Sequence, residues 1–486
     1  MKLRKQEIVK ALLEILPRDA VLFEAEDLHP YECDGLSAYR RLPMLVALPN
    51  TVEQVQQILR FCYQNDVAVV ARGAGTGLSG GALPHEEGVL LSLAKFNNIL
   101  EVDAEERVAR VQPGVRNLAI SQAVDSLGLY YAPDPSSQIA CTIGGNVAEN
   151  SGGVHCLKYG LTVHNIQQLK IVTIEGELLT IGNSGLDSAG YDLLALMTGS
   201  EGMLGVITEV TVKLLPKPER AQVVLAAFDD VVHAGSAVGN IIAAGIIPAG
   251  LEMMDKLAIQ AAEDFVHAGY PTDAEAILLC ELDGTNKEVS EQILLVRGIL
   301  QDSGATEIRT AKDEAERMTF WKGRKAAFPA VGRISPDYYC MDGTIPRKRL
   351  PEVLKTIADL SKEYDLAVAN VFHAGDGNLH PLILYDANKP GELKRTEEFG
   401  GKILELCVAV GGTITGEHGV GMEKINQMCV QFESAELTQF HAVKNAFDKK
   451  GLLNPGKAVP TLHRCAEFGA MHIHRGELPF PELERF

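Results

Sequence analysis

Closely spaced cysteines are missing from this chain of 486 residues. Its nine cysteines are scattered, at positions 33, 62, 141, 156, 280, 340, 407, 429 and 465. No pair has the spacing that normally holds an iron–sulfur cluster, so the usual ligand set of such a cluster is excluded. An odd number of scattered cysteines, without an apolar N-terminal signal segment, favours reduced thiols and a cytoplasmic protein.

Positive charge and long apolar runs are also scarce. Lys and Arg number 45 against 64 Asp and Glu, which gives a net charge of -19. This balance excludes binding of nucleic acid through phosphate contacts. The longest stretch without charged residues, 234–251, contains Gly, Ser, Asn and Pro, so it predicts a buried helix followed by a loop rather than a membrane span. We therefore expect no direct membrane insertion.

Glycine, by contrast, is abundant, with 46 residues that are largely clustered. Short strand-like segments with few helices fill residues 42–218, and Pro216-Lys217-Pro218 closes them. Strands and helices alternate over 219–450, which predicts an α+β unit with an antiparallel sheet and helices on one side. An amphipathic helix is expected within an N-terminal segment, 1–41.

Two histidines and a carboxylate stand in glycine-rich motifs. His373 and His380 lie seven residues apart in VFHAGDGNLH, residues 371–380. This pattern predicts a strand that turns sharply and returns, which brings both imidazoles to one point. Glu417, in TGEHGVG (415–421), adds a carboxylate. Two His and one carboxylate suit a catalytic divalent cation with open coordination positions, such as Zn or Mn.

Two further side chains have the chemistry of catalytic residues. His418 directly follows Glu417 and is not needed as a ligand, so it is the candidate general base. Arg324 is the candidate clamp for a substrate carboxylate, because a guanidinium binds a carboxylate through two parallel hydrogen bonds. A metal-free acid–base site, and a surface salt bridge for Arg324, are the alternatives at this point.

The first glycine cluster, RGAGTGLSGG at 72–81, follows the apolar segment 67–71. Three of its glycines formally match GxGxxG, but that dinucleotide fingerprint needs a helix immediately afterwards. Here the strand-like segment 88–91 follows too soon. A loop at this place binds phosphate through successive backbone N–H groups, and a glycine-rich turn without a ligand is the alternative.

Three later segments strengthen the ligand interpretation. Loop 133–153 contains glycine pairs interleaved with Thr and Asn, segment 199–207 has three glycines, and NPGK stands at 454–457. Glycine pairs let the backbone lie directly against a flat ligand, because no side chain holds the ligand away.

Together these segments resemble the flavin-binding domain of the vanillyl-alcohol-oxidase type. With the His373 and Glu417 motifs, they closely resemble the FAD-linked subunits of bacterial glycolate oxidases, which are similar to D-lactate and D-2-hydroxyglutarate dehydrogenases. The resemblance covers nearly the whole chain. It implies an α+β fold with a vanillyl-alcohol-oxidase-type FAD-binding domain at 42–218, a substrate or cap domain at 219–450, and a C-terminal segment, 451–486, that packs on the FAD domain.

The resemblance also implies which residues contact FAD, and that FAD is bound noncovalently, because Thr76 stands near the place where some flavoproteins attach the flavin to His. The implied FAD contacts are Arg72, Gly73, Ala74, Gly75, Thr76, Gly77, Pro133, Asp134, Cys141, Thr142, Gly144, Gly145, Asn146, Ala148, Asn150, Gly153, Tyr159, Glu201, Gly202, Gly205, Ile207 and Asn454. The metal ligands and the base that it implies are the residues already singled out, His373, His380 and Glu417, with His418 beside them.

The reaction implied is oxidation of glycolate to glyoxylate, with D-lactate also accepted. Electrons are expected to pass to an iron–sulfur subunit, alongside a second flavin-domain-like subunit, in a complex peripheral to the inner face of the cell membrane. A D-lactate or D-2-hydroxyglutarate dehydrogenase is the alternative. A metal-dependent hydrolase and a nonenzymatic electron-transfer subunit are more distant alternatives, because neither explains both the glycine loops and the histidines.

Overall fold

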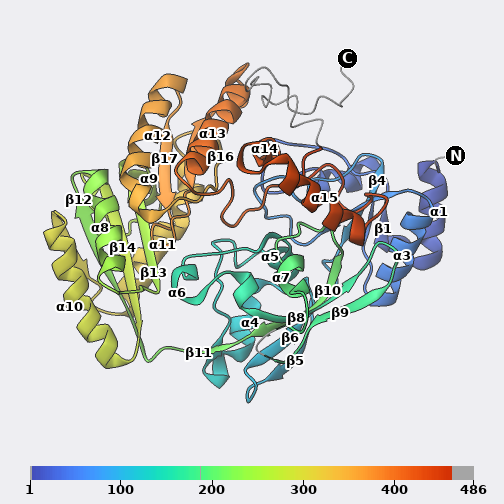
Figure 1. The fold of residues 1–486 in the computed structure, drawn as a ribbon, viewed down its shortest axis with the longest axis horizontal. Coiled ribbons are helices and arrows are strands. Elements are labelled where there is room, and N and C mark those ends of the chain that lie inside the picture. The colour runs from blue at the N-terminus through green and yellow to red at the C-terminus, as the bar shows by residue number, and fades with distance from the viewer. Residues whose placement is uncertain (1–2, 186–187, 462–486) are drawn as a thin grey trace.

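The computed structural model describes residues 3–185 and 188–461. Figure 1 shows two domains side by side, with the blue and teal elements up to residue 216 in one and the green to orange elements of 220–409 in the other. Helix α15 (Ser434–Phe447, red) lies again over the first domain. Lys444 of α15 donates hydrogen bonds to the backbone oxygens of Met203 and Leu453. The chain thus rejoins the first domain before residue 450, the boundary expected from the sequence.

The first domain is built on two sheets and a short ribbon. A four-stranded sheet has the order β1 (Val21–Leu22), β2 (Leu45–Ala47), β4 (Gly88–Ser92) and β3 (Ala68–Arg72), with β4 parallel to both β2 and β3. An antiparallel five-stranded sheet has the order β5 (Ile99–Asp103), β6 (Val108–Val111), β10 (Val206–Lys213), β8 (Ile166–Val172) and β9 (Leu178–Gly182). The ribbon pairs β7 (Leu129–Tyr130) with β11 (Leu215–Pro216).

The helices of this domain cover its sheets. They are α1 (Lys5–Ile15), α2 (Ala25–Leu28), α3 (Val52–Gln64), α4 (Asn117–Val124), α5 (Ile143–Glu149), α6 (Cys156–Tyr159) and α7 (Leu193–Met197). Helix α3 begins at Thr51, whose side chain accepts from Gln54 N, and its residues at the 3–4 spacing expected of an amphipathic helix are buried.

Helix α5 corrects an expectation, because the sequence predicted a loop throughout 133–153. Ile143, Asn146 and Val147 have helical spacing and are buried, which outweighs the poor helix propensity of Gly144 and Gly145. A Cβ on Gly144 would lie 2.4 Å from the side chain of Pro113, so glycine allows this helix to pack closely.

The second domain is a seven-stranded antiparallel sheet, as the sequence predicted. Its order is β15 (Glu307–Thr310), β12 (Arg220–Phe228), β14 (Ala276–Gly284), β13 (Gly250–Asp255), β17 (Val368–Phe372), β18 (Pro381–Tyr385) and β16 (Asp337–Cys340). Its helices are α8 (Val231–Ala243), α9 (Lys256–Val266), α10 (Asn286–Asp302), α11 (Glu314–Val331), α12 (Leu350–Tyr364) and α13 (Glu392–Ala409), and α14 (Met428–Gln431) follows.

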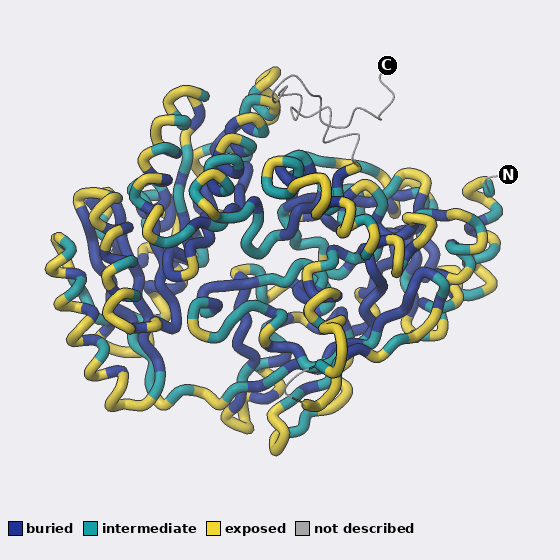
Figure 2. Tube along the Cα trace, viewed as in Figure 1, coloured by how far each residue is buried: buried dark blue, intermediate teal, exposed yellow. Residues whose placement is uncertain are grey.

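These helices lie on both faces of the sheet, whereas the sequence pattern predicted them on one. Val224, Ala226 and Phe228 pack with α8, α10, α12 and α13, while the alternate residues of β12 pack with α9 and α11. Strand β12 is therefore buried on both faces, and Figure 2 shows the sheets of both domains as mostly buried trace.

The described part of the C-terminal segment, 451–461, packs on the first domain. Leu453 forms a β-bridge with Val69, and Asn454 Nδ2 donates to the backbone oxygens of Gly81 and Glu201. The remainder of the expected segment, 462–486, lies outside the described residues. Among the helices of 3–185 and 188–461, none is long and apolar enough to cross a membrane.

Candidate active site

A cavity of about 500 Å³ lies between the two domains and is lined by residues from both. Sixteen of the residues expected to contact FAD line it: Arg72, Gly73, Ala74, Gly75, Thr76, Gly77, Cys141, Thr142, Gly144, Gly145, Asn146, Ala148, Glu201, Gly202, Gly205 and Ile207. The second domain contributes all five residues expected to be catalytic or metal-binding: Arg324, His373, His380, Glu417 and His418. Segments separated by more than 300 residues thus meet at one site.

The first glycine loop begins where β3 ends and forms one wall of the cavity. Gly73 packs tightly on the second wall, since a Cβ there would lie 2.3 Å from Thr142 Oγ1. Gly75 has φ +69° and lies against the Arg72 guanidinium. At Gly77, however, a Cβ would meet nothing within 4 Å, and the cavity lies in front of it. The absence of a side chain at Gly77 therefore leaves space for a ligand.

Polar groups in these walls fit the parts of a dinucleotide. Thr142 Oγ1 is buried without a protein partner, which leaves a donor or acceptor for a ligand. Arg72 supplies a largely buried cation in a chain of net charge -19, as a pyrophosphate requires. Gly202, like Gly77, would direct a Cβ into open space at the cavity. The residues present thus fit FAD, with glycine backbone, a hydroxyl and a cation facing one volume.

Six residues expected to contact FAD lie outside the cavity lining. Two of them, Asp134 and Tyr159, connect the two domains, and a third, Asn454, contacts the first glycine loop. Asp134 pairs with His155 and Lys325, and Tyr159 donates to Asp283 Oδ2 at 2.6 Å. Asn454 holds the glycine loop from behind through Gly81 O.

The other three shape the backbone of the first domain. Pro133 O accepts from Asn117 Nδ2, and Asn150, at φ 54°, ends α5 and accepts from Val163 N. Gly153, at φ +149°, packs against the Asp134 backbone. These residues therefore position the segments around the cavity.

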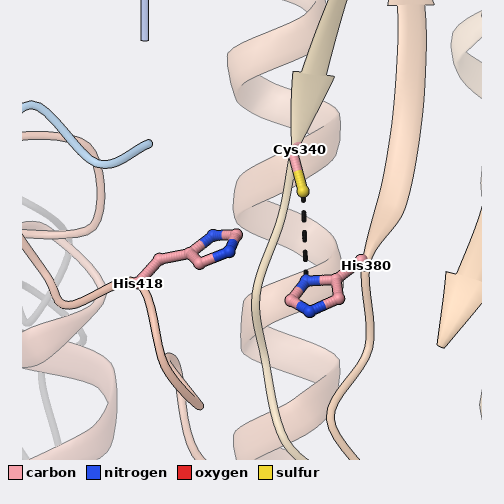
Figure 3. A group of neighbouring side chains, drawn as sticks. All are labelled: Cys340, His380 and His418. Carbon is pink, nitrogen blue, oxygen red and sulfur yellow. Dashed lines mark hydrogen bonds between the residues drawn. The ribbon is translucent and has the colours of Figure 1, made fainter. Parts of the chain in front are cut away.

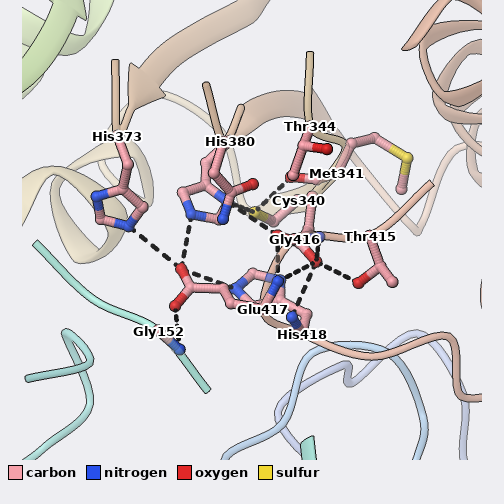
Figure 4. A network of polar contacts seen from close by, with 12 residues as sticks. Gly152, Cys340, Met341, Thr344, His373, His380, Thr415, Gly416, Glu417 and His418 are labelled. Atoms are coloured by element: carbon pink, nitrogen blue, oxygen red, sulfur yellow. Dashed lines mark hydrogen bonds and ion pairs between the residues drawn. The ribbon is translucent and has the colours of Figure 1, made fainter. Parts of the chain in front are cut away.

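The wall formed by the second domain gathers two imidazoles on one carboxylate oxygen (Figure 4). Glu417 Oε1 lies 3.2 Å from His373 Nε2 and 2.9 Å from His380 Nε2. The other carboxylate oxygen accepts from Gly152 N, at 3.0 Å, so the first domain also holds this side chain. Burial alone raises the pKa of Glu417, but the hydrogen bonds from both histidines outweigh burial and hold the pKa well below its usual range.

His418 lies beside this cluster, with its ring stacked on that of His380. The ring centroids are 4.9 Å apart, with planes inclined by 14°. His418 Nδ1 is buried and has no hydrogen-bond partner in the protein. Burial lowers the pKa of His418 to about 4, although the neighbouring Asp342 opposes this shift. The imidazole is therefore neutral near pH 7 and has a ring nitrogen available to accept a proton.

Asp342 was not singled out from the sequence, yet it fixes the loop that carries Glu417 and His418. Its carboxylate accepts from the backbone N–H groups of Gly416, Glu417 and His418, and it pairs with Lys424 Nζ at 3.1 Å. Because these donors occupy it, Asp342 anchors the loop rather than facing a ligand.

Donor atoms for a metal converge on His380. Within the described residues, His380 and His418 belong to two groups of donors whose atoms lie within 4.8 Å of one another, one with Cys340 and one with Asp342 and Glu417. Figure 3 shows the Cys340 side chain pointing toward the His380 ring, with Sγ 4.0 Å from Nδ1. His373 joins neither group, although it meets His380 at the shared Glu417 oxygen. The chemistry of the expected set, two imidazoles and a carboxylate, fits a divalent cation.

Arg324 projects from α11 into the same cavity and is fully buried. Its Nη2 lies 2.6 Å from Glu252 Oε2, but none of its three nitrogens makes a directional hydrogen bond within the protein. Arg324 thus forms a salt bridge, but a buried one, so the surface pair considered as the alternative is wrong. The guanidinium still has N–H groups left for an anionic ligand.

Other cavity residues were also missed from the sequence. They include Ser136, Ser137, Glu149, Lys325 and Phe328. Phe328 follows Arg324 by one helical turn, so recognition of α11 as a helix would have placed both on one face. The ring of Phe328 meets that of His380 edge-on, with centroids 6.0 Å apart.

The fold defines the class of protein. The chain superposes on p-cresol methylhydroxylase with a TM-score of 0.79, at 18% identity, over 94% of this chain and 97% of that one. Two family profiles match: "FAD binding domain" over residues 43–182, and "FAD linked oxidases, C-terminal domain" over 217–458. A two-domain flavoprotein fold of the vanillyl-alcohol-oxidase type is thereby confirmed.

Two curated relatives narrow the class. The chain is 70% identical to glycolate oxidase subunit GlcD of Escherichia coli (strain K12), over 99% of this chain and 97% of the relative. It is 32% identical to D-lactate dehydrogenase of Anaerostipes hadrus, over 93% of this chain and 97% of that one. The chain therefore belongs to the family of FAD-linked oxidases that contains GlcD.

Proposed function

We propose that this chain oxidises glycolate to glyoxylate with FAD as the electron acceptor, and that it also accepts D-lactate. The observation that carries the proposal is the single cavity in which the glycine walls of the FAD-binding domain face Arg324, Glu417 and three histidines. The Escherichia coli relative is named as a glycolate oxidase subunit, and the Anaerostipes hadrus relative as a D-lactate dehydrogenase. Both names describe 2-hydroxy-acid oxidation.

The side chains have separate roles in this reaction. Arg324 binds the substrate carboxylate through N–H groups that have no partner within the protein. His418 accepts the proton of the α-hydroxyl at Nδ1, its unpartnered ring nitrogen, as the C=O bond of the product forms. FAD, when bound, supplies the acceptor for the Cα hydrogen and its two electrons.

Phe328 favours short substrates. Its ring lines the cavity one turn along α11 from Arg324 and contacts His380. A substrate held between Arg324 and His418 would share the cavity with this apolar ring. This wall supports glycolate and D-lactate over D-2-hydroxyglutarate, which carries a second carboxylate.

FAD is held noncovalently in this proposal. Thr76 stands in the first glycine loop, where some flavoproteins attach the flavin to His, and its hydroxyl does not form such a bond. Glycine backbone and the Arg72 cation are then left to hold the cofactor.

We also propose a divalent cation, Zn or Mn, held by His373, His380 and Glu417. The support is the convergence of both Nε2 atoms on Glu417 Oε1 in a buried site. A cation held there would supply Lewis-acid chemistry toward the substrate hydroxyl.

Replacement of His373 or His380 by Ala is expected to remove the metal and lower activity, because each variant loses one of three protein ligands. Metal per chain, measured by mass spectrometry, checks the prediction, with His233→Ala as the control since His233 is exposed on α8. A fully active wild-type chain without metal would show that these residues act only as acid–base or positioning groups.

Electrons leave the chain, in our proposal, through partner subunits. The chain has no cysteine spacing for an iron–sulfur cluster. The cluster that accepts its electrons in this proposal therefore belongs to a separate iron–sulfur subunit. A second flavin-domain-like subunit completes the complex at the inner face of the cell membrane. The name of the Escherichia coli relative, a subunit, supports assembly with other chains. Reduction by glycolate of a copurifying iron–sulfur signal, observed by electron paramagnetic resonance, tests the route.

The proposed activity is tested by the visible spectrum of the purified chain under anaerobic conditions. Flavin absorbance is expected before addition of substrate, and glycolate is expected to bleach it. Rates with glycolate, D-lactate and D-2-hydroxyglutarate, measured side by side, separate the proposed function from its closest alternatives. A colourless active protein would favour a metal-dependent hydrolase, and failure to turn over an artificial dye would favour a nonenzymatic electron carrier.

A further inference from the structure

Glu252 is a fully buried carboxylate just behind the cavity wall, at 1% exposure. It does not line the cavity, yet it contacts two residues that do. His373 Nδ1 lies 2.8 Å and 3.0 Å from its two oxygens, and Arg324 Nη2 lies 2.6 Å from Oε2. One carboxylate thus joins the imidazole of the proposed metal site to the guanidinium of the proposed substrate clamp.

The fold places Glu252 there for clear reasons. Strand β13 pairs antiparallel with β17 through Met253 and Phe372, so the next residues along, Glu252 and His373, lie opposite each other. Strand alternation then directs Glu252 away from Leu251 and Met253, which pack on the other face of the sheet. Helix α11 covers the face to which Glu252 points, and this helix carries Arg324.

A carboxylate at this depth is costly unless its charge is matched. The neighbours of Glu252 match it from two sides, with a cation in Arg324 and a ring nitrogen in His373. A hydrogen bond from the Nδ1–H of a metal-binding imidazole to a carboxylate fixes the tautomer and the ring orientation. Here it leaves His373 Nε2 facing Glu417.

We propose that Glu252 is a positioning residue that aims His373 and Arg324 into one cavity at the same time. The inference deepens the proposed function and rests on it. Glu252 holds Arg324 by one end, at Nη2, and leaves Nε and Nη1 directed to the substrate carboxylate. It holds His373 at Nδ1 and leaves Nε2 to the reacting side. Arg324 and His373 are thereby kept at a fixed distance from each other. A 2-hydroxy acid bound in the cavity must fit its carboxylate and its hydroxyl to that distance.

The test replaces Glu252 by Gln, which keeps an acceptor for His373 but removes the charge that faces Arg324. FAD content is expected to stay at the wild-type level, because Glu252 does not line the cavity. The Kd of acetate, which has a carboxylate but no α-hydroxyl, is expected to rise about 10–100-fold, the size of effect that loss of an outer-shell partner has at metal sites. Perturbation of the flavin spectrum measures this Kd without turnover.

The matched control is Asp255→Asn. Asp255 is a half-buried carboxylate three residues along the same strand, but its partners are Ala258 N and Asn370, outside the cavity. This variant is expected to bind acetate like the wild type. Equal loss of acetate binding in both variants would show a general effect of disturbing β13 and would overturn the proposal.

A second comparison separates positioning from a merely structural role. In an Arg324→Ala background, Glu252→Gln is expected to have no further effect on acetate binding, because its action passes through Arg324. Independent, multiplying losses would overturn this part of the proposal, and so would wild-type acetate affinity in Glu252→Gln alone.

If Glu252→Gln does not fold, Glu252→Asp is used to test the proposal instead. It keeps the charge but is shorter by one methylene, so it is expected to fold, to retain FAD and to bind acetate weakly. Wild-type affinity in that variant would overturn the proposal, as would failure to fold. Acetate binding does not depend on the reaction, so it can be measured even if none of the 2-hydroxy acids reduces the wild-type flavin. That absence of reduction would refute the proposed function, but not the role of Glu252.

Discussion

Replacement of Gly77 by Val is expected to yield a folded chain that has lost nearly all its FAD. A Cβ at this position would meet no protein atom within 4 Å, so the fold has room for it. The space in front of Gly77 is the cavity itself, and a branched side chain would occupy the volume of the cofactor. The measurement is flavin released per chain by acid precipitation, alongside circular dichroism of the same sample.

The control for this variant is Gly298→Val. Gly298 lies in α10, and a Cβ there also meets nothing within 4 Å, but it is far from the cavity lining. This chain should keep its FAD. Gly75 is a weaker test, because its φ of +69° and its contact with Arg72 would strain any substitution whether or not FAD binds. Unchanged flavin in Gly77→Val would remove the first glycine loop from the FAD site, and flavin that stays on the precipitated chain would contradict noncovalent binding.

The turn between His373 and His380 was predictable because its determinants are local. Strands β17 and β18 pair antiparallel on either side of it, and His373 bridges Asn378. Gly377 adopts φ +86°, a conformation in which glycine is favoured. The strand that turns and returns, expected from 371–380, is confirmed.

The partners of these histidines were not predictable in the same way. Glu252 stands between apolar residues in strand β13, 121 residues before His373 in the chain. Asp342 accepts from the backbone of His418, 76 residues away. Each contact depends on strand order in the folded sheet, and a single sequence carries no periodic pattern for that order. An acid flanked by apolar residues inside a buried strand was the only local signal, since such a charge needs a partner.

Two errors have different causes, because the sequence contained a signal for the first and a misleading signal for the second. The run VVLAAF, residues 223–228, is apolar at successive positions, which is typical of a strand buried on both faces. Helix α11 was missed because Gly323 and Pro329 stand inside it. Gly323 is required there, since a Cβ would lie 2.5 Å from the hydroxyl of Tyr270. Packing in the folded protein therefore overrides local propensity in the helix that carries Arg324.

Replacement of His418 by Ala is expected to slow flavin reduction by glycolate about 10²–10⁴-fold, the usual contribution of a general base, while FAD remains bound. The reason is the state of the imidazole: burial lowers its pKa to about 4, so it is neutral near pH 7, and Nδ1 has no partner within the protein. Without it, the remaining candidates are poor bases. Both oxygens of Glu417 already accept hydrogen bonds, from the two histidines and from Gly152 N, and His380 uses Nε2 in that contact. Anaerobic stopped-flow absorbance of the flavin measures the single-turnover rate.

Added imidazole provides a second test of this prediction. Removal of the His418 ring leaves a space of the same shape in the cavity, and free imidazole can enter that space. If His418 acts by accepting a proton, free imidazole should restore part of the rate in His418→Ala, and restoration should follow the fraction of unprotonated imidazole as pH rises. A variant that lost activity through misplacement of Glu417 would not respond to imidazole. His233→Ala, exposed on α8, should match the wild type throughout. A near wild-type rate of flavin reduction in His418→Ala would show that His418 is not the general base. Proton removal would then fall to His373 or His380, the two histidines that contact Glu417.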